Sequence, residues 1–64
     1  MQLSVPDMTC GHCKASVETA LVALDPAATV QVDLAARRVA VDTSASAAQV
    51  IAALQDAGFE ATAA

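Results

Sequence analysis

The chain has 64 residues, of which 56% are hydrophobic and 16% are charged. A chain this short folds as one domain with a thin core, which excludes a multidomain enzyme with a deep substrate cavity. Its net charge is −4, from seven acidic and three basic residues, so it lacks the basic surface of a nucleic-acid-binding protein. It has no apolar run of membrane-spanning length and no signal-peptide pattern at its N-terminus, so we expect a cytoplasmic protein without membrane insertion.

The first half of the chain predicts a short strand, a loop and a helix. Residues 3–5 alternate apolar and polar side chains, and Pro6 ends this strand because it has no N–H group to donate to a ladder. Residues 7–13 form a loop that contains both cysteines. Apolar side chains then recur at helical spacing over residues 14–24, and Pro26 ends this helix.

The second half predicts a hairpin, a second helix and a last strand. Residues 30–34 and 39–42 alternate as strands, although the stretch between them lacks the Asn-Gly or Asp-Gly pair that favours tight hairpins. A helix then begins at Ala47, after several Ser and Thr N-cap candidates. It stops at Gly58, which readily adopts a left-handed conformation, and residues 59–62 predict the final short strand.

This order of elements predicts an α+β, ferredoxin-like βαββαβ sandwich, with a four-stranded antiparallel sheet and two helices on one face. Right-handed crossovers make the first two strands parallel and insert the third strand between them. The cysteine loop, the 35–38 hairpin and the Gly58 loop then lie at one end of the fold. We therefore expect Arg37, Arg38 and Phe59 to lie near the cysteines.

The only two cysteines, Cys10 and Cys13, form one Cys-x-x-Cys pair. A disulfide between them would close too short a loop to stabilise the fold, so in a reducing compartment the spacing indicates a metal site or a redox site. At the start of a helix the two sulfurs can face one point. The partial positive charge of the helix N-terminus and the neighbouring Lys14 both favour thiolates there.

Two thiolates alone form a soft site of low coordination number. Such a site suits Cu(I) better than Zn(II), which takes four ligands. An exposed two-ligand site also leaves room for an incoming thiolate, so the ion can pass between proteins by ligand exchange. This chemistry is typical of a metal carrier.

The cysteines lie in the run Met8-Thr9-Cys10-Gly11-His12-Cys13, between a strand and an amphipathic helix, and Ala57-Gly58-Phe59 follows near the end. With these features nearly the whole chain resembles the heavy-metal-associated domain, in particular the small bacterial copper chaperones. The resemblance implies a single domain over residues 1–64 that is not an enzyme. It implies Cu(I) bound by Cys10 and Cys13, with Met8 pointing inward beneath the loop. It also implies delivery to the metal-binding domains of a copper-transporting P-type ATPase.

Two residues depart from the family pattern. Asp7 stands where the family usually has Gly, and Phe59 stands where many bacterial chaperones have Tyr. Phe at that place is common in the domains attached to the ATPases, so the resemblance leaves a free chaperone and such a domain both open.

Three alternatives concern the cysteine pair itself. The protein could be a Zn(II) or Cd(II) carrier in which His12 or Asp7 supplies an extra ligand. It could be a thiol–disulfide redox protein, because the stretch from Cys10 to Lys14 also resembles the active site of protein disulfide isomerases, although Thr9 replaces their Trp. A metal-bridged homodimer is a third possibility, because each cysteine pair leaves coordination sites open.

The three basic residues are Lys14, Arg37 and Arg38, and the predicted topology puts all of them at the cysteine end. We hypothesise that they offset the anionic thiolate–metal centre and attract an acidic face of a partner protein.

Overall fold

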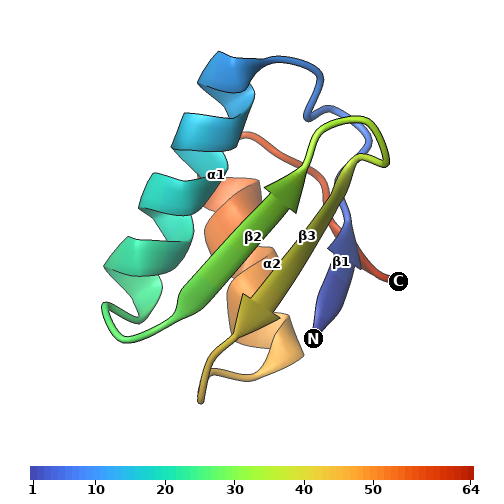
Figure 1. Ribbon diagram of the computed structural model, residues 1–64. Helices are drawn as coiled ribbons and strands as arrows, with labels where there is room; N and C mark the ends of the chain where they lie inside the picture. The colour runs from blue at the N-terminus through green and yellow to red at the C-terminus, as the bar shows by residue number, and fades with distance from the viewer.

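The computed structural model describes residues 1–64 as one sheet with both helices packed on the same face (Figure 1). The elements in chain order are β1 (Gln2–Ser4), α1 (Gly11–Leu24), β2 (Thr29–Asp33), β3 (Arg38–Asp42), α2 (Ala47–Asp56) and β4 (Thr62–Ala63). This is the predicted βαββαβ order.

The sheet has the strand order β2-β3-β1-β4, and every pair of neighbours is antiparallel. β1 and β2 are therefore parallel to each other, with β3 between them, as the handedness of the crossovers predicted. In Figure 1, α2 lies behind β2 and β3, and α1 lies along the β2 side of the sheet. The ferredoxin-like prediction is confirmed.

The core lies between the sheet and the two helices. On each helix the buried residues are four positions apart, so they lie on one face, and on β3 they alternate as a half-buried strand requires. No polar or charged residue is buried. Any polar or charged side chain that takes part in binding or reaction therefore lies at the surface. The buried residues are Leu3, Val5, Met8, Val17, Leu21, Val39, Val41, Val50, Leu54 and Ala61.

The two ends of α2 are fixed by local hydrogen bonds. Ser46 and Gln49 form a capping box at the start, with each side chain accepting the other residue's backbone N–H. At the other end Gly58 has φ +95° and donates to Gln55, while the Phe59 N–H donates to the Leu54 carbonyl at 2.8 Å. This pair of bonds is a Schellman motif.

That motif corrects the predicted last strand. The Phe59 N–H belongs to the end of α2, so Phe59 packs against the core instead of pairing with β1. Pairing with β1 begins only at Thr62, opposite Ser4. The strand therefore spans Thr62–Ala63 and not residues 59–62.

The loop before α1 and the β2–β3 hairpin lie at the same end of the molecule (Figure 1). A hydrogen bond of 2.9 Å from the Val5 N–H to the Arg37 carbonyl joins the hairpin to the segment that leads to Cys10. The topology thus brings the hairpin beside the cysteine loop, as predicted.

At the opposite end, Asp25 links the end of α1 to the segment before α2. One carboxylate oxygen accepts the Thr43 hydroxyl at 2.6 Å, and the other accepts the Ala27 N–H at 3.0 Å. The Thr43 hydroxyl oxygen in turn accepts the Ala45 N–H at 3.2 Å. The hydrogen bond from Thr43, followed by that from Ala27, lowers the pKa of Asp25 below its ordinary value.

This linkage predicts an acid-sensitive contribution to stability. Because folding lowers the pKa of Asp25, its contribution is present above the unfolded-state pKa of about 3.9 and is lost as the pH falls through the lower folded-state pKa. Asp25→Asn should lower the urea midpoint near pH 7, and the difference from wild type should shrink at about pH 2 to 3. Asp42→Asn, at an exposed aspartate at the end of β3, is the control. An Asp25→Asn deficit that is the same at both pH values would contradict the assignment.

Candidate metal centre

The sulfur atoms of Cys10 and Cys13 lie 3.2 Å apart, and both cysteines are free. The two differ in exposure. Cys10 is exposed, whereas Cys13 is half-buried and packs against the core. One sulfur is therefore held by the body of the protein, and the other stands at its surface.

The start of α1 creates this pair. Cys10 is the N-cap residue with an extended backbone, and its carbonyl accepts the first helical hydrogen bond, from the Lys14 N–H at 3.1 Å. The helix begins at Gly11, three residues earlier than the predicted start at residue 14, so Cys13 lies inside the first turn. Residues three apart on a helix share a face, which turns both sulfurs to the same side.

The helix start also changes the acidity of the outer cysteine. The backbone N–H of Cys13, followed by the Cys13 side chain, lowers the pKa of Cys10 below its ordinary value. A lowered thiol pKa is expected at the start of a helix, where free backbone N–H groups and the positive end of the helix dipole favour the charged form. The thiolate of Cys10 therefore forms more readily than that of an ordinary cysteine.

Met8 anchors the loop from below. Its side chain is fully buried, and its N–H donates to the Val5 carbonyl at 3.1 Å, closing a turn around Pro6 and Asp7. The thioether lies in the core with the apolar side chains, as the resemblance implied. Two residues later the chain reaches Cys10 at the surface.

His12 and Asp7, the two candidate extra ligands, are both exposed. His12 lines a shallow hollow on α1 that Ala57 also borders. Nowhere does the structure gather three or more His, Cys, Asp or Glu side chains around a possible ion site. The sulfur pair thus stands without a preassembled third ligand.

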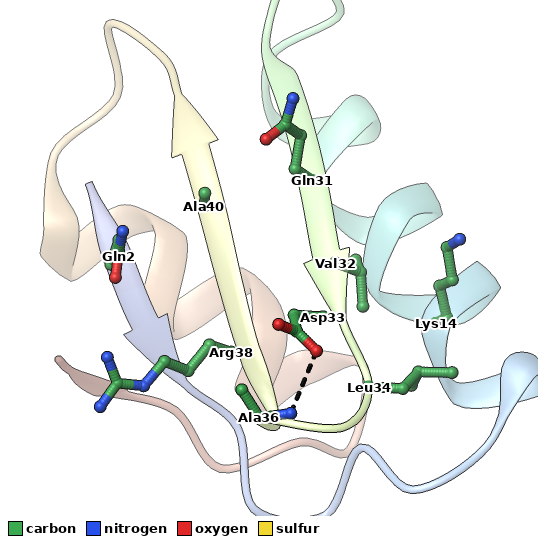
Figure 2. Close-up of a pocket in the computed structure, with 9 residues that line it drawn as sticks. All are labelled: Gln2, Lys14, Gln31, Val32, Asp33, Leu34, Ala36, Arg38 and Ala40. Atoms are coloured by element: carbon green, nitrogen blue, oxygen red, sulfur yellow. Dashed lines mark hydrogen bonds between the residues drawn. The ribbon is translucent and has the colours of Figure 1, made fainter.

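Two of the three basic residues, Lys14 and Arg38, do not lie side by side. Figure 2 shows Lys14 on α1 and Arg38 on β3, on opposite sides of Asp33 and Leu34 and pointing away from each other. The Asp33 carboxylate accepts the Ala36 N–H at 3.1 Å and so closes the hairpin. Sequence reasoning placed the cations at this end but missed the acidic residue between them. An aspartate just before a turn was the available signal.

These polar side chains border a hollow on the open face of the sheet, together with Gln2, Gln31 and Ala40 (Figure 2). The side chains in it diverge and do not converge on one point. Neither Cys10 nor Cys13 lines this hollow.

Neither α1 nor α2 reaches the length and hydropathy that a membrane-spanning helix requires.

Comparison with known proteins gives consistent matches along the chain. The family model described as the heavy-metal-associated domain matches residues 2–60. The copper chaperone CopZ of Staphylococcus aureus (strain bovine RF122 / ET3-1) is 36% identical over 61 residues, which cover 91% of this chain and 90% of that protein.

Solved structures agree with this match. A gold-binding protein is 51% identical, with a TM-score of 0.93 over 95% of this chain and 94% of that one. The copper chaperone Atx1 of Synechocystis PCC6803 is 35% identical, with a TM-score of 0.95 over 97% and 98% of the two chains. The chaperones among these relatives carry metal and are not enzymes, in agreement with the expectation of a non-enzymatic protein. The chain belongs to the heavy-metal-associated domain family.

Proposed function

We propose that this protein is a copper chaperone that carries Cu(I) on the sulfurs of Cys10 and Cys13, with residues 1–64 acting as one domain. The observation that carries the proposal is the pair of free sulfurs 3.2 Å apart at a helix N-terminus, one of them exposed. We also infer a cytoplasmic setting, because thiols stay reduced there.

The geometry suits a bound ion that is easily passed on. Two metal–sulfur bonds of about 2.3 Å set in line would separate the sulfurs by about 4.6 Å, against 3.2 Å in the metal-free pair, so a two-coordinate ion requires the pair to open. Cys10 can make that movement because it is exposed, whereas Cys13 is packed against the core. An incoming thiolate can then replace Cys10 while Cys13 still holds the ion.

The relatives support a soft monovalent metal. The CopZ and Atx1 relatives are named as copper chaperones, and the relative that is 51% identical is named as a gold-binding protein. Cu(I) and Au(I) both favour thiolates and few ligands, so Au(I) is the second candidate cargo. The absence of a preassembled third ligand is consistent with both.

The recipient that we propose is a metal-binding domain of a copper-transporting P-type ATPase. Copper chaperones of this family are expected to deliver to such domains, and an acceptor Cys-x-x-Cys offers the thiolates that ligand exchange needs. Lys14, Arg37 and Arg38 would favour an acidic face on that domain, with Asp33 restricting how the two surfaces fit.

Metal titration tests the cargo. The reduced protein is titrated without oxygen with Cu(I), Au(I), Zn(II) and Cd(II), each against a competing chelator, alongside Cys10→Ser, Cys13→Ser, His12→Ala and Asp7→Ala. We expect tight one-to-one Cu(I) binding that needs both cysteines and neither His12 nor Asp7, because only the sulfurs converge. Two protein copies per ion would indicate the metal-bridged homodimer.

Other outcomes of the titration would reject the copper assignment. Preferential binding of Zn(II) or Cd(II) with His12 or Asp7 required would identify a divalent-metal carrier. Weak binding of every metal, with turnover in an insulin-disulfide reduction assay, would identify a thiol–disulfide redox protein.

Variants of Met8 separate an anchor from a ligand. Met8→Leu should keep Cu(I) affinity and cost less than about 1.5 kcal/mol of unfolding free energy, because Leu fills nearly the same volume. Met8→Ala should cost about 2 to 5 kcal/mol, because it leaves a cavity in the core. Chemical denaturation and chelator competition measure the two effects. A large loss of Cu(I) affinity in Met8→Leu with stability intact would make the thioether a ligand.

Transfer kinetics test the exchange mechanism. When Cu(I)-loaded protein is mixed with an apo Cys-x-x-Cys domain of a P-type ATPase, the rate should rise with acceptor concentration, because the acceptor thiolate takes part in the step. The same acceptor with both cysteines changed to Ser is the control. A rate that does not depend on acceptor concentration would show that the ion leaves before the partner arrives.

A further inference from the structure

Arg37 is the only residue other than glycine with a positive φ, at 55°. It is the last residue of the turn between β2 and β3, and its N–H donates to the Leu34 carbonyl at 3.3 Å. Residues with a Cβ disfavour this left-handed region, whereas Gly and Asn enter it readily. The hairpin therefore holds Arg37 in a conformation that its own side chain does not favour.

This conformation has a consequence outside the hairpin. β1 and β3 pair up to Ser4 opposite Arg38, and the next contact is the bond of 2.9 Å from the Val5 N–H to the Arg37 carbonyl. The left-handed backbone of Arg37 therefore directs the carbonyl that holds Val5, the residue that follows β1. Pro6 follows and has no N–H with which to extend the pairing.

Val5 connects its hydrogen bond with Arg37 to the segment that leads to the cysteines. Its carbonyl accepts the Met8 N–H at 3.1 Å, and both side chains are fully buried. A continuous path of backbone hydrogen bonds thus runs from Arg37 through Val5 to Met8, two residues before Cys10. The exposed sulfur of Cys10 has no other anchor on its N-terminal side among the hydrogen bonds of the structure.

We propose that Arg37 is a positioning residue for the metal site, and that its left-handed backbone, and not its guanidinium group, holds the segment that leads to Cys10. The inference rests on the proposed function, in which Cys10 binds the metal. The hairpin conformation then controls how firmly Cys10 is kept beside Cys13, and so how readily a bound ion is released.

Three neutral substitutions at one position separate conformation from charge. Arg37→Val, Arg37→Asn and Arg37→Gly all remove the guanidinium, but only the β-branched Val opposes a positive φ. Arg37→Ala is a milder substitute if Arg37→Val does not fold. Val30→Ala, in the half-buried part of β2 away from the cysteine loop, lowers global stability and serves as the matched control.

Amide hydrogen exchange in the reduced, metal-free protein is the first measurement. We expect Arg37→Val to speed exchange at Val5 and Met8 by about tenfold relative to the core amide of Leu54. Asn and Gly should restore the protection, because they accept the left-handed backbone. Unchanged protection of both amides in Arg37→Val would overturn the proposal.

Release of Cu(I) to bathocuproine disulfonate is the second measurement. Arg37→Val should release the ion about threefold faster, with rescue by Asn and Gly. Equal acceleration in all three variants would assign the effect to the lost charge and overturn the proposal. Equal acceleration in Val30→Ala would assign it to lower stability and overturn it as well.

A third measurement keeps this inference separate from the proposed function. If the wild-type protein fails to bind Cu(I), the proposed function is wrong. Hydrogen exchange and the rate at which iodoacetamide alkylates Cys10 in a Cys13→Ser background still decide the positioning role. A change in alkylation rate in Arg37→Val that Asn and Gly reverse supports it, and equal rates in all variants reject it.

Discussion

The packing of α1 against the sheet determines where the sulfurs lie. Val17 and Leu21 are buried four residues apart, and burial of each such side chain contributes about 1.5 to 3 kcal/mol relative to exposure. This packing sets the rotation of α1, and the rotation sets the direction in which its first turn faces. Cys13 is then half-buried against the core while Cys10, at the cap, meets solvent.

The two sulfurs differ in exposure and in how firmly the protein holds them. The inner sulfur belongs to a regular helix and moves with it. The outer sulfur belongs to a cap residue whose backbone is extended, so it is tied to the helix on one side only. In the proposed function, a metal between the two sulfurs would have one firmly held ligand, Cys13, and one that can be exchanged, Cys10. The same start of α1 lowers the pKa of Cys10 below its ordinary value.

The topology could be predicted because it depends on the order of elements and the handedness of crossovers, which local irregularities do not alter. Cys10 and Cys13 could be chosen from the sequence as candidate metal ligands, because two cysteines with this spacing at the start of a helix can face one point. The beginning of α1 was misplaced because Cys10 is not a favoured N-cap residue and Gly11, the first helical residue, has a low helix propensity. The last strand was misplaced because the Schellman motif at Gly58 takes the Phe59 N–H. The left-handed backbone of Arg37 could not be predicted, because arginine itself favours a negative φ and the pairing of β2 with β3 overrides that preference.

The pairing of β4 with β1 places the two chain termini side by side. The Ala64 N–H donates to the Gln2 carbonyl at 3.0 Å, and β1 runs from there toward the cysteine loop. Both termini therefore lie at the end of β1 remote from the sulfurs (Figure 1). Any polypeptide joined to either terminus would emerge from the opposite pole of the domain. Copies linked in tandem, or a copy fused to a larger protein, would keep their cysteine loops uncovered, so the domain can be joined to other chains without a change at the cysteine pair.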